Sequence, residues 1–570
     1  MHPIQYFLLL SIILLFAGLY KIFEKAGEKG WKALIPVYHF VVWLKILKKP
    51  WWWIILILIP TISWLMFFIL FVETAKAFGK KTFKEHCYAL FGYFIYMPYL
   101  GFDKANSWIG PPDESKVKRT LGKEWAEAGI FAVIAATIIR TFFIEAFTIP
   151  TSSLEKSLMV GDYLFVSKVS YGAKVPNTPL SFPFAHNVLP FTDGVPSYLE
   201  WVKLPNFRFP GLGKVERNDY VVFNFPEGDT VELNHAASSY YGLVRRFGRE
   251  NVFNPSFRDR DGTPFGNIIV RPVDKLDNYV KRCVALPGDK FEIRNKMLFI
   301  NNQPAYVPPN LQYSYKINNL AYNLFDPSTV WDRQPKPLKL GNELDITDPP
   351  QPMGDEHNDS ILEVQLTAHD VEKLMQMNPN CIQALCDSNY YERRDIDVFP
   401  HSTNYKWTKD NYGPLVIPKE GVTISLDTAN LPLYQRIISV YENNTLEVKN
   451  GLVFINGKEA HSYTFHQDYY FMMGDNRHNS LDSRYWGFAP DDHIVGKPVF
   501  VWMSLKKDVP FSQKFRWNRF FTFIHRDSIS KSYLLYALLI AGAIYAFISF
   551  RPKKKSDMAT KEILSKGKKK

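Results

Sequence analysis

The sequence predicts a mainly β, antiparallel protein with an inserted second domain and transmembrane helices at both ends of the chain. Three observations lead to this fold class. Apolar residues alternate in the segments 163–169, 220–225 and 278–284, long apolar stretches flank the soluble part, and one hairpin-like pattern occurs twice. Alternation with period two is typical of half-buried strands. An apolar stretch of about 20 residues is long enough to cross a bilayer.

Five apolar stretches are candidate membrane spans: 4–20, 53–72, 88–102, 128–147 and 533–550. The third is short, which leaves four or five crossings. The first has no basic flank before it and no small-x-small cleavage site after it, so we expect an anchor rather than a cleaved signal peptide. The segments 21–49, 104–123 and 551–570 are rich in lysine and arginine and are expected in the cytoplasm. Residues 148–532 are then expected outside the cytoplasm, whether the chain crosses the membrane four or five times.

The charge of the chain indicates which partners to expect, and its cysteine content indicates which disulfides and metal sites to expect. The 570 residues have a formal net charge of +12, much of it lysine beside apolar stretches or in the tail, which favours contact with anionic lipid. The soluble part has no basic patch interleaved with aromatic residues, so no nucleic acid is expected. Cys381 and Cys386 could form a small disulfide or remain free thiols. No segment has zinc spacing, and we expect no metal and no other cofactor.

The soluble part contains an internal repeat. Residues 291–302 and 446–457 both read as strand, Asn turn, strand, Asn turn, which is typical of a β-hairpin. Between them, the stretch 303–444 is rich in proline and weakly periodic, and it is expected to form an inserted, smaller domain with a helix at 367–376. The expected domains are a membrane region (1–125), a transmembrane helix (126–148), a β domain (149–302 and 445–532), the insertion (303–444), a second transmembrane helix (533–550) and a basic tail (551–570).

Ser153 lies just beyond the apolar stretch 128–147 and is a candidate nucleophile. A serine needs a base to take its proton. None of the histidines between 148 and 532 stands in a strong nucleophile-orienting pattern, and His478 is the best candidate among them. Lys281 is the alternative, because it shares one face of a strand with Tyr279 and Cys283, and a buried lysine loses its charge readily. An ordinary exposed strand lysine would have no such role.

Four segments, in this order, carry a resemblance to a known family. They are Ile149-Pro-Thr-Ser-Ser-Leu154 with Gly161-Asp162, then 218–223, then Tyr279-Val-Lys-Arg-Cys-Val-Ala-Leu-Pro-Gly-Asp289, and finally 474–487 with Ile494-Val-Gly-Lys497. Together they resemble the characteristic segments of bacterial type I signal peptidases, the membrane-anchored Ser/Lys proteases. The resemblance covers a minority of the chain and implies a β-rich fold of coiled antiparallel sheets.

The resemblance also implies roles for single residues. Ser153 is expected to attack the scissile carbonyl and Lys281 to act as general base. Ser480 is expected to orient the lysine amine, and the Thr151 hydroxyl to join the N–H of Ser153 in an oxyanion hole. Two charged pairs, Asp475 with Arg282 and Asp482 with Arg484, are expected to support the site. The alternative interpretation is that these four residues only stabilise local turns.

The nucleophile segment departs from the pattern of many relatives. This chain has Ser152 where those relatives have glycine, Leu154 where they have methionine, and Lys156 where they have proline. Counting from Ile149-Pro150 and from Gly161-Asp162 favours Ser153 over Ser152 as nucleophile. In the last segment His478 stands for an aspartate, close to Ser480.

The function implied by the resemblance is removal of N-terminal signal peptides from exported preproteins by a Ser/Lys dyad. The expected location is the cytoplasmic (inner) membrane, crossed several times, with the catalytic domain on the periplasmic side. Expected partners are signal-peptide-bearing preproteins, membrane lipid and the secretion translocon. Two alternatives stay open: a catalytically inactive scaffold, and a Ser/Lys protease with another membrane substrate.

Overall fold

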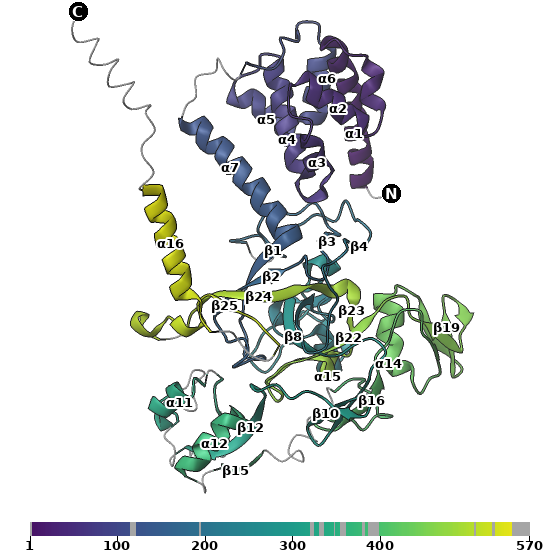
Figure 1. Cartoon of the computed structure of the whole chain (residues 1–570). Helices are drawn as coiled ribbons and strands as arrows, with labels where there is room; N and C mark the ends of the chain where they lie inside the picture. The colour runs from purple at the N-terminus through teal and green to yellow at the C-terminus, as the bar shows by residue number, and fades with distance from the viewer. Residues whose placement is uncertain are drawn as a thin grey trace, which may run out of the picture.

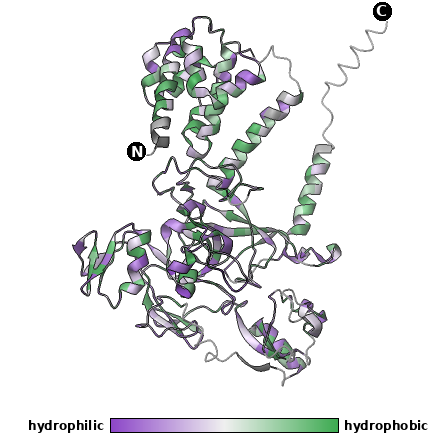
Figure 2. Cartoon of the chain, turned by 180° about the vertical axis from the view of Figure 1, so that it is seen from behind, coloured by the Kyte–Doolittle hydropathy of each residue, from purple (hydrophilic) through white to green (hydrophobic). Residues whose placement is uncertain are grey.

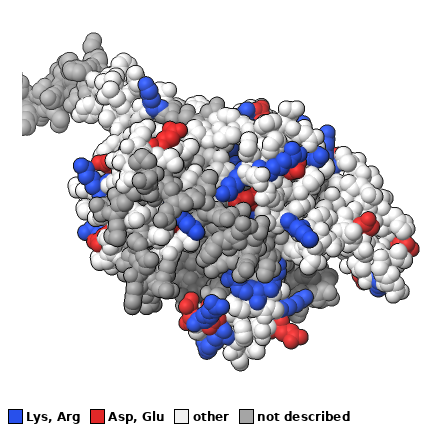
Figure 3. All heavy atoms as spheres, turned by 90° about the horizontal axis from the view of Figure 1, so that it is seen from below, with Lys and Arg blue, Asp and Glu red and all other residues white. Residues whose placement is uncertain are grey.

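The computed structural model describes residues 3–113, 121–192, 195–319, 324–329, 336–346, 348–353, 361–378, 382–385, 398–506, 509–526 and 531–549. Figure 1 shows a group of short helices at one end, a curled sheet in the middle and two lobes at the opposite end. These helices contain many hydrophobic residues, with hydrophilic stretches among them (Figure 2). The surface seen from the opposite end carries basic and acidic side chains among neutral ones (Figure 3). The N-terminal helices and the two lobes thus lie at opposite ends of the sheet (Figure 1).

The N-terminal helices share one core, which contains Trp43 and Phe71. They are α1 (Pro3–Lys25), the 3-10 turn Gly30–Leu34, α2 (Tyr38–Ile46), α3 (Trp53–Leu58), α4 (Pro60–Ala77), α5 (Phe83–Phe91) and α6 (Tyr93–Phe102). The expected span 53–72 is divided between α3 and α4, because Pro60 has no N–H to continue a helix and instead opens the next one. The expected span 88–102 is divided at Gly92 between α5 and α6.

The helix that leads to the sheet ends earlier than expected. α7 (Leu121–Ile138) continues into one π turn, Ile139–Phe143, and β1 (Ile144–Thr148) follows. The expected span 128–147 is therefore wrong at its carboxyl end. β1 pairs antiparallel with β2 (Asp162–Ser167) at the edge of the main sheet. The carboxylate of Glu145 lies 2.6 Å from Arg140 and 2.8 Å from Lys168, which further holds this segment against the sheet.

Within the described residues, α4 is the one helix with both the length and the apolar composition of a membrane span. α16 (Leu534–Ser549) is apolar over the shorter stretch Leu534–Phe547. The number of crossings and their direction stay a prediction.

The expectation of a mainly antiparallel β protein is confirmed. The main sheet has the strand order β1-β2-β24-β5-β8-β22-β23, with β25 on β24. Its pairs are antiparallel. The remaining strands of this sheet are β5 (Tyr220–Asn224), β8 (Asn278–Ala285), β22 (Tyr469–Met473), β23 (Ala489–Pro490), β24 (Ile494–Ser504) and β25 (Thr522–Phe523). The central strands β5 and β22 are buried along their whole length.

Two similar hairpins account for the internal repeat. β9 (Lys290–Arg294), β10 (Met297–Ile300) and β11 (Gln303–Pro304) form the first, and β18 (Leu446–Lys449), β19 (Leu452–Ile455) and β20 (Lys458–Glu459) form the second. Every turn of both has two residues at positive φ, for example Asn450 (52°) and Gly451 (78°). Two-residue turns of this kind match the twist of antiparallel strands, and asparagine and glycine tolerate them.

The segment 303–444, expected as one inserted domain, is divided between two cores. Residues between Gln312 and Leu385, here called the inserted lobe, have their own core around Ile317, Leu344 and Leu374. Residues 398–444 instead pack with both hairpins around Phe291 and Val453. They do so because β16 (Tyr412–Val416) pairs with β9, and β17 (Thr423–Ser425) pairs with β21 (Ser462–Thr464).

The inserted lobe contains β12 (Gln312–Asn318), β13 (Gln351–Pro352), β14 (Ile361–Thr367), β15 (Ile382–Leu385), α11 (Lys339–Glu343) and α12 (Ala368–Met377). α12 agrees with the predicted helix at 367–376. The structure adds short helices that the sequence did not single out: α8 (Tyr240–Phe247), α9 (Arg249–Val252), α14 (Leu431–Arg436) and α15 (Ser483–Trp486). Further short strands are β3 (Lys174–Val175), β4 (Phe207–Arg208), β6 (Thr230–Glu232) and β7 (Ile268–Val270).

The structure does not test the predicted disulfide or the predicted basic tail. Cys381, Cys386 and the tail 551–570 lie outside the described residues. The proposed disulfide between the first two therefore stays a prediction. Cys87 and Cys283 are free thiols.

Replacing Thr367 by alanine is expected to destabilise the inserted lobe by about 1 kcal/mol. The Thr367 hydroxyl accepts the Asp370 N–H at 3.1 Å, and the Asp370 carboxylate accepts the Thr367 N–H at 3.1 Å, which caps α12 at its first turn. The rate of proteolytic cleavage within the lobe measures the loss. Thr367→Ser keeps the hydroxyl and should behave as wild type. Equal cleavage of the alanine variant and the wild type would contradict this prediction.

Candidate active site

Ser153 lies in a tight turn between β1 and β2. The turn is closed at its base, where the Ile149 N–H donates to the Asp162 carbonyl and the Gly161 N–H donates to the Ile149 carbonyl, both at 2.9 Å. Leu154 and Leu158 are buried in the apolar cluster beneath the sheet. Gly161 has φ of +88°, and a Cβ there would collide with the Leu505 carbonyl oxygen. The turn that carries Ser153 is thus fixed from below and at both ends.

Lys281 comes from β8, opposite Val221 of β5. Its side chain is 4% exposed, and its Nζ donates a hydrogen bond to the Ser153 hydroxyl oxygen. Burial disfavours the charged ammonium and lowers the pKa of Lys281 to about 8. Lys174 has a pKa lowered to about 8 for the same reason, but its ammonium donates to the Asp492 carbonyl. The contact with a serine hydroxyl, rather than the lowered pKa, distinguishes Lys281.

Ser480 lies beside this pair without bonding to it. Its hydroxyl is buried and makes no hydrogen bond within the described part of the chain, so the expected bond to the Lys281 amine is not made here. Gly474 brings the two serines together. A Cβ on Gly474 would lie 2.5 Å from the Ser153 carbonyl oxygen and 2.6 Å from the Ser480 Cβ. The sequence reasoning did not single out Gly474, since a glycine in a polar loop suggests only a turn.

Arg282 and Asp475 form a buried ion pair on the opposite face of β8. The Arg282 guanidinium donates two hydrogen bonds to the carboxylate, each at 2.7 Å, and both side chains are almost fully buried. Ser157 donates to Asp475 at 2.6 Å and Tyr220 donates at 3.2 Å. Burial alone would raise the pKa of Asp475, but Arg282 lowers it below its ordinary value. Ser157 joins the turn of Ser153 to this pair, a contact that the sequence did not indicate.

Asp482 and Arg484 form the second buried pair. Two guanidinium nitrogens of Arg484 donate to the Asp482 carboxylate, each at 2.9 Å. Arg484 also donates to the Arg477 carbonyl at 2.6 Å, and Asp482 accepts the Gly474 N–H at 3.1 Å. The pair therefore spans the loop from Gly474 to Arg484 and fixes its shape.

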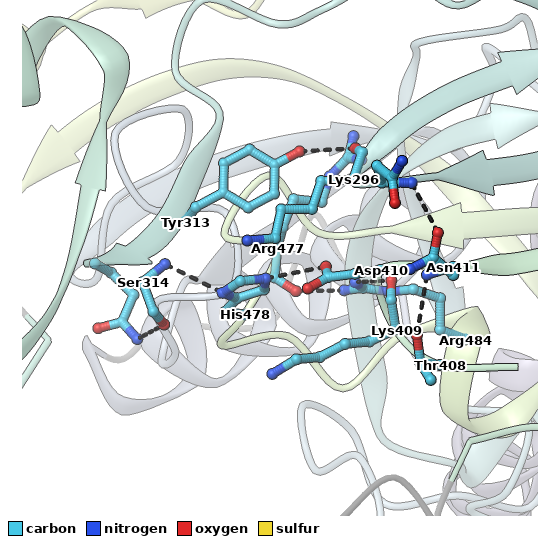
Figure 4. A network of polar contacts seen from close by, with 12 residues as sticks. Lys296, Tyr313, Ser314, Thr408, Lys409, Asp410, Asn411, Arg477, His478 and Arg484 are labelled. Atoms are coloured by element: carbon cyan, nitrogen blue, oxygen red, sulfur yellow. Dashed lines mark hydrogen bonds and ion pairs between the residues drawn. The ribbon is translucent and has the colours of Figure 1, made fainter. Parts of the chain in front are cut away.

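His478, the alternative base, lies in a network on the far side of this loop (Figure 4). Its Nδ1 accepts the Ser314 N–H at 3.2 Å, so in the neutral ring Nε2 carries the proton and donates to Asp410 at 3.1 Å. Burial lowers the pKa of His478, which favours this neutral form. Both ring nitrogens are engaged, and Ser314 belongs to β12 of the inserted lobe. The geometry fits a structural link better than a base.

A pocket lies in front of Ser153 and Lys281. It is lined by residues 147–154 and 278–281 together with Leu164, Val222, Ala237, Asn479 and Leu481. Thr151 is exposed at this pocket, on the nucleophile turn. β8 pairs with β5 over 278–282, but β22 pairs with it only from Arg282 onward. Within the described residues, the second edge of 278–281 therefore has no strand partner and faces the pocket.

Known proteins share this combination of segments. The signal peptidase family, peptidase S26, matches residues 122–334 and 416–503, and a family of unknown function matches residues 31–111. Signal peptidase I of Pseudomonas fluorescens is 56% identical over 411 residues, which cover 70% of this chain and 79% of that protein. Signal peptidase I of Haemophilus influenzae is 23% identical over 418 residues, covering 72% and 79%. That of Buchnera aphidicola subsp. Baizongia pistaciae is 24% identical over 383 residues, covering 66% and 74%. The chain therefore belongs to the signal peptidase family S26, as a bacterial type I signal peptidase.

Proposed function

We propose that this chain is a membrane-bound serine endopeptidase that removes N-terminal signal peptides from exported preproteins with a dyad of Ser153 and Lys281. The observation that carries the proposal is the hydrogen bond between Lys281 Nζ and the Ser153 hydroxyl, with both side chains buried. A lysine with a pKa of about 8 is partly neutral near physiological pH and can accept a proton.

The chemistry follows from this contact. Neutral Lys281 takes the Ser153 proton as the oxygen attacks the scissile carbonyl, and the ammonium then gives a proton to the leaving amine. A water molecule, deprotonated by the same lysine, hydrolyses the ester on Ser153. The Ser480 hydroxyl, buried and unbonded beside Gly474, is available to accept a hydrogen bond from the lysine. The Ser153 N–H and the Thr151 hydroxyl are the proposed donors to the oxyanion.

An extended substrate fits the pocket. The unpaired edge of 278–281 offers backbone groups to which a peptide can add as a strand, and residues 149–152 lie on the other side of the pocket. The lining side chains Ile149, Leu164 and Val222 are apolar. They suit small apolar side chains on alternate positions before the cleaved bond.

The membrane location is supported by the polarity of the molecule. α7 and α16 leave the sheet toward the same end (Figure 1); α16 is apolar, and α7 is apolar after Glu127 (Figure 2). In the segment that follows β3 and ends in β4, Phe182, Phe184, Trp201 and Phe207 are each at least half exposed. Exposed aromatic rings of this kind are stable at a lipid headgroup layer. We propose that this end lies in the cytoplasmic membrane and that residues 148–532 are on its outer side.

Replacing Ser153 or Lys281 by alanine should abolish cleavage of a purified preprotein while the protein stays folded. Ser153→Ala removes the attacking oxygen, and Lys281→Ala removes the base. Ser152→Ala is the matched control and should retain measurable turnover, because its hydroxyl does not contact Lys281 among the described contacts. Sequencing of the new amino terminus shows the bond that is cut. Turnover by Ser153→Ala, or none by Ser152→Ala, would point to Ser152 as nucleophile.

The pH dependence should report Lys281. Because the base must be neutral, kcat/KM should rise with pH through about 8 and fall about tenfold for each pH unit below that pKa. Lys281→Arg keeps the charge but stays protonated at every accessible pH, so it should be inactive throughout. A rate that is flat between about pH 6 and pH 8 would exclude a lysine base with this pKa.

Gly474→Ala should lower kcat by about 100-fold, because a displacement of about 1 Å at a reacting group can cost that much. The added Cβ would push apart the Ser153 carbonyl and Ser480, both within 2.6 Å of it. Gly242→Ala on α8 is the control, since a Cβ there meets its nearest atoms at 3.8 Å. The kcat of the two variants on one preprotein, with their thermal unfolding, tests this. A Gly474→Ala enzyme of normal kcat would show that the close approach does not matter.

A further inference from the structure

The inserted lobe reaches the nucleophile turn through one buried carboxylate. Asp348 follows α11 and is 6% exposed. It accepts hydrogen bonds from the side-chain amides of Asn476 at 2.7 Å and Asn479 at 3.0 Å. The Ser152 hydroxyl is also hydrogen-bonded to it. Burial raises the pKa of Asp348, whereas the three donors favour its ionised form.

The amides that Asp348 holds in turn hold the backbone around Ser153. The Asn476 side chain uses its second N–H on the Ser152 carbonyl at 3.3 Å, and the Asn476 backbone N–H donates to the Ser153 carbonyl at 3.1 Å. Asn479 donates to the Ser152 hydroxyl at 3.3 Å. The Ser152 carbonyl and the Ser153 N–H belong to one planar peptide unit, so fixing the carbonyl also fixes the direction of the N–H.

A second contact from the same lobe holds the other side of the turn. The Lys156 ammonium donates to the carbonyls of Leu344 and Asp345 in the lobe, and Asn310, which precedes the lobe, donates to the Lys156 carbonyl at 3.3 Å. Lys156 has φ of +65°, a conformation that proline cannot adopt and that other residues rarely adopt. Ser152 and Lys156 are two of the positions at which this chain departs from the pattern of many relatives. Both departures make contacts with the inserted lobe.

We propose that Asp348 is a positioning residue for the peptidase reaction. Its carboxylate orients Asn476, and through Asn476 it orients the Ser152–Ser153 peptide whose N–H binds the oxyanion in the proposed mechanism. Asp348 also sets the place of Asn479 at the wall of the substrate pocket. The inserted lobe thus contributes to the rate without contacting the substrate. This inference rests on the proposed function.

The test compares Asp348→Asn with the wild type in the purified full chain, using a preprotein as substrate. The asparagine keeps the shape but presents an N–H to donors, so kcat should fall by about 10- to 100-fold, the factor that corresponds to losing a hydrogen bond to a charged group. KM should stay within about twofold, because the substrate edge of β8 is untouched. Asp326→Asn is the matched control: this carboxylate lies in the same lobe and bonds to Ser328 at the surface, and its kinetics should be those of the wild type.

A second variant separates positioning from general damage to the lobe. Lys156→Gly keeps the positive φ but deletes the ammonium, and it should lower kcat by about threefold to tenfold with KM and protease resistance of the lobe unchanged. A kcat within about threefold of wild type for Asp348→Asn would overturn the inference while leaving the proposed function intact. A fall in kcat that accompanies loss of protease resistance in both variants would overturn it as well. A wild-type chain that does not cleave preprotein would instead refute the proposed function itself.

Discussion

The burial of Lys281 against Ser153 is the constraint on which the rest of the site depends. A buried lysine stays neutral only if nearby carboxylates do not restore its charge, yet Asp482 and Asp475 both lie close enough to raise its pKa. Each of them is bound by two hydrogen bonds from an arginine, Arg484 or Arg282. The Arg484 charge opposes this effect and lowers the pKa of Lys281, and the bidentate geometry keeps each carboxylate bound to its arginine. The two pairs therefore stabilise turns, while burial is the largest cause of the lowered pKa of Lys281.

The loop from Gly474 to Arg484 connects this constraint to the whole molecule. It approaches the Ser153 backbone at Gly474 and Asn476, and it contacts the inserted lobe through Gln312, whose N–H donates to the Asp475 carbonyl and whose carbonyl accepts the Arg477 N–H, both at 2.9 Å. His478 adds a bond to β12 on one side and to Asp410 on the other. These hydrogen bonds hold the loop against both the nucleophile turn and the lobe, although the Ser480 hydroxyl and the Asn476 Oδ1 have no hydrogen-bond partner within the described residues. The lobe and the nucleophile turn are consequently parts of one arrangement, although they are far apart in sequence.

What the sequence could predict was local. Period-two alternation placed Lys281 on a strand, paired asparagine turns placed both hairpins, and the segment 367–376 indicated the helix α12. The end of α7 was missed because apolar residues such as Ile144 suit a buried strand as well as a membrane helix, and pairing with β2 decides between them. The partition of 303–444 and the contact of Asp348 with Asn476 were missed because they depend on tertiary packing. The sequence showed Ser152 and Lys156 as departures from the residues of many relatives. It did not show that their partners are Asp348 and the carbonyl of Leu344 in the inserted lobe.

The length of β1, which lies between the helical segment and Ser153, determines how far a substrate anchored in the proposed membrane must extend to reach Ser153. β1 has five residues, and a strand rises about 3.3 Å per residue, so up to about 17 Å of extended chain separates the end of the helical segment at Phe143 from the start of the nucleophile turn. With the proposed membrane location and nucleophile, a substrate anchored in the same bilayer would have to cover a similar distance before its cleaved bond meets Ser153. An extended conformation covers it with the fewest residues, and an extended peptide is what the open edge of 278–281 can bind. The early end of α7 and the unpaired edge of β8 therefore both favour a substrate in an extended conformation.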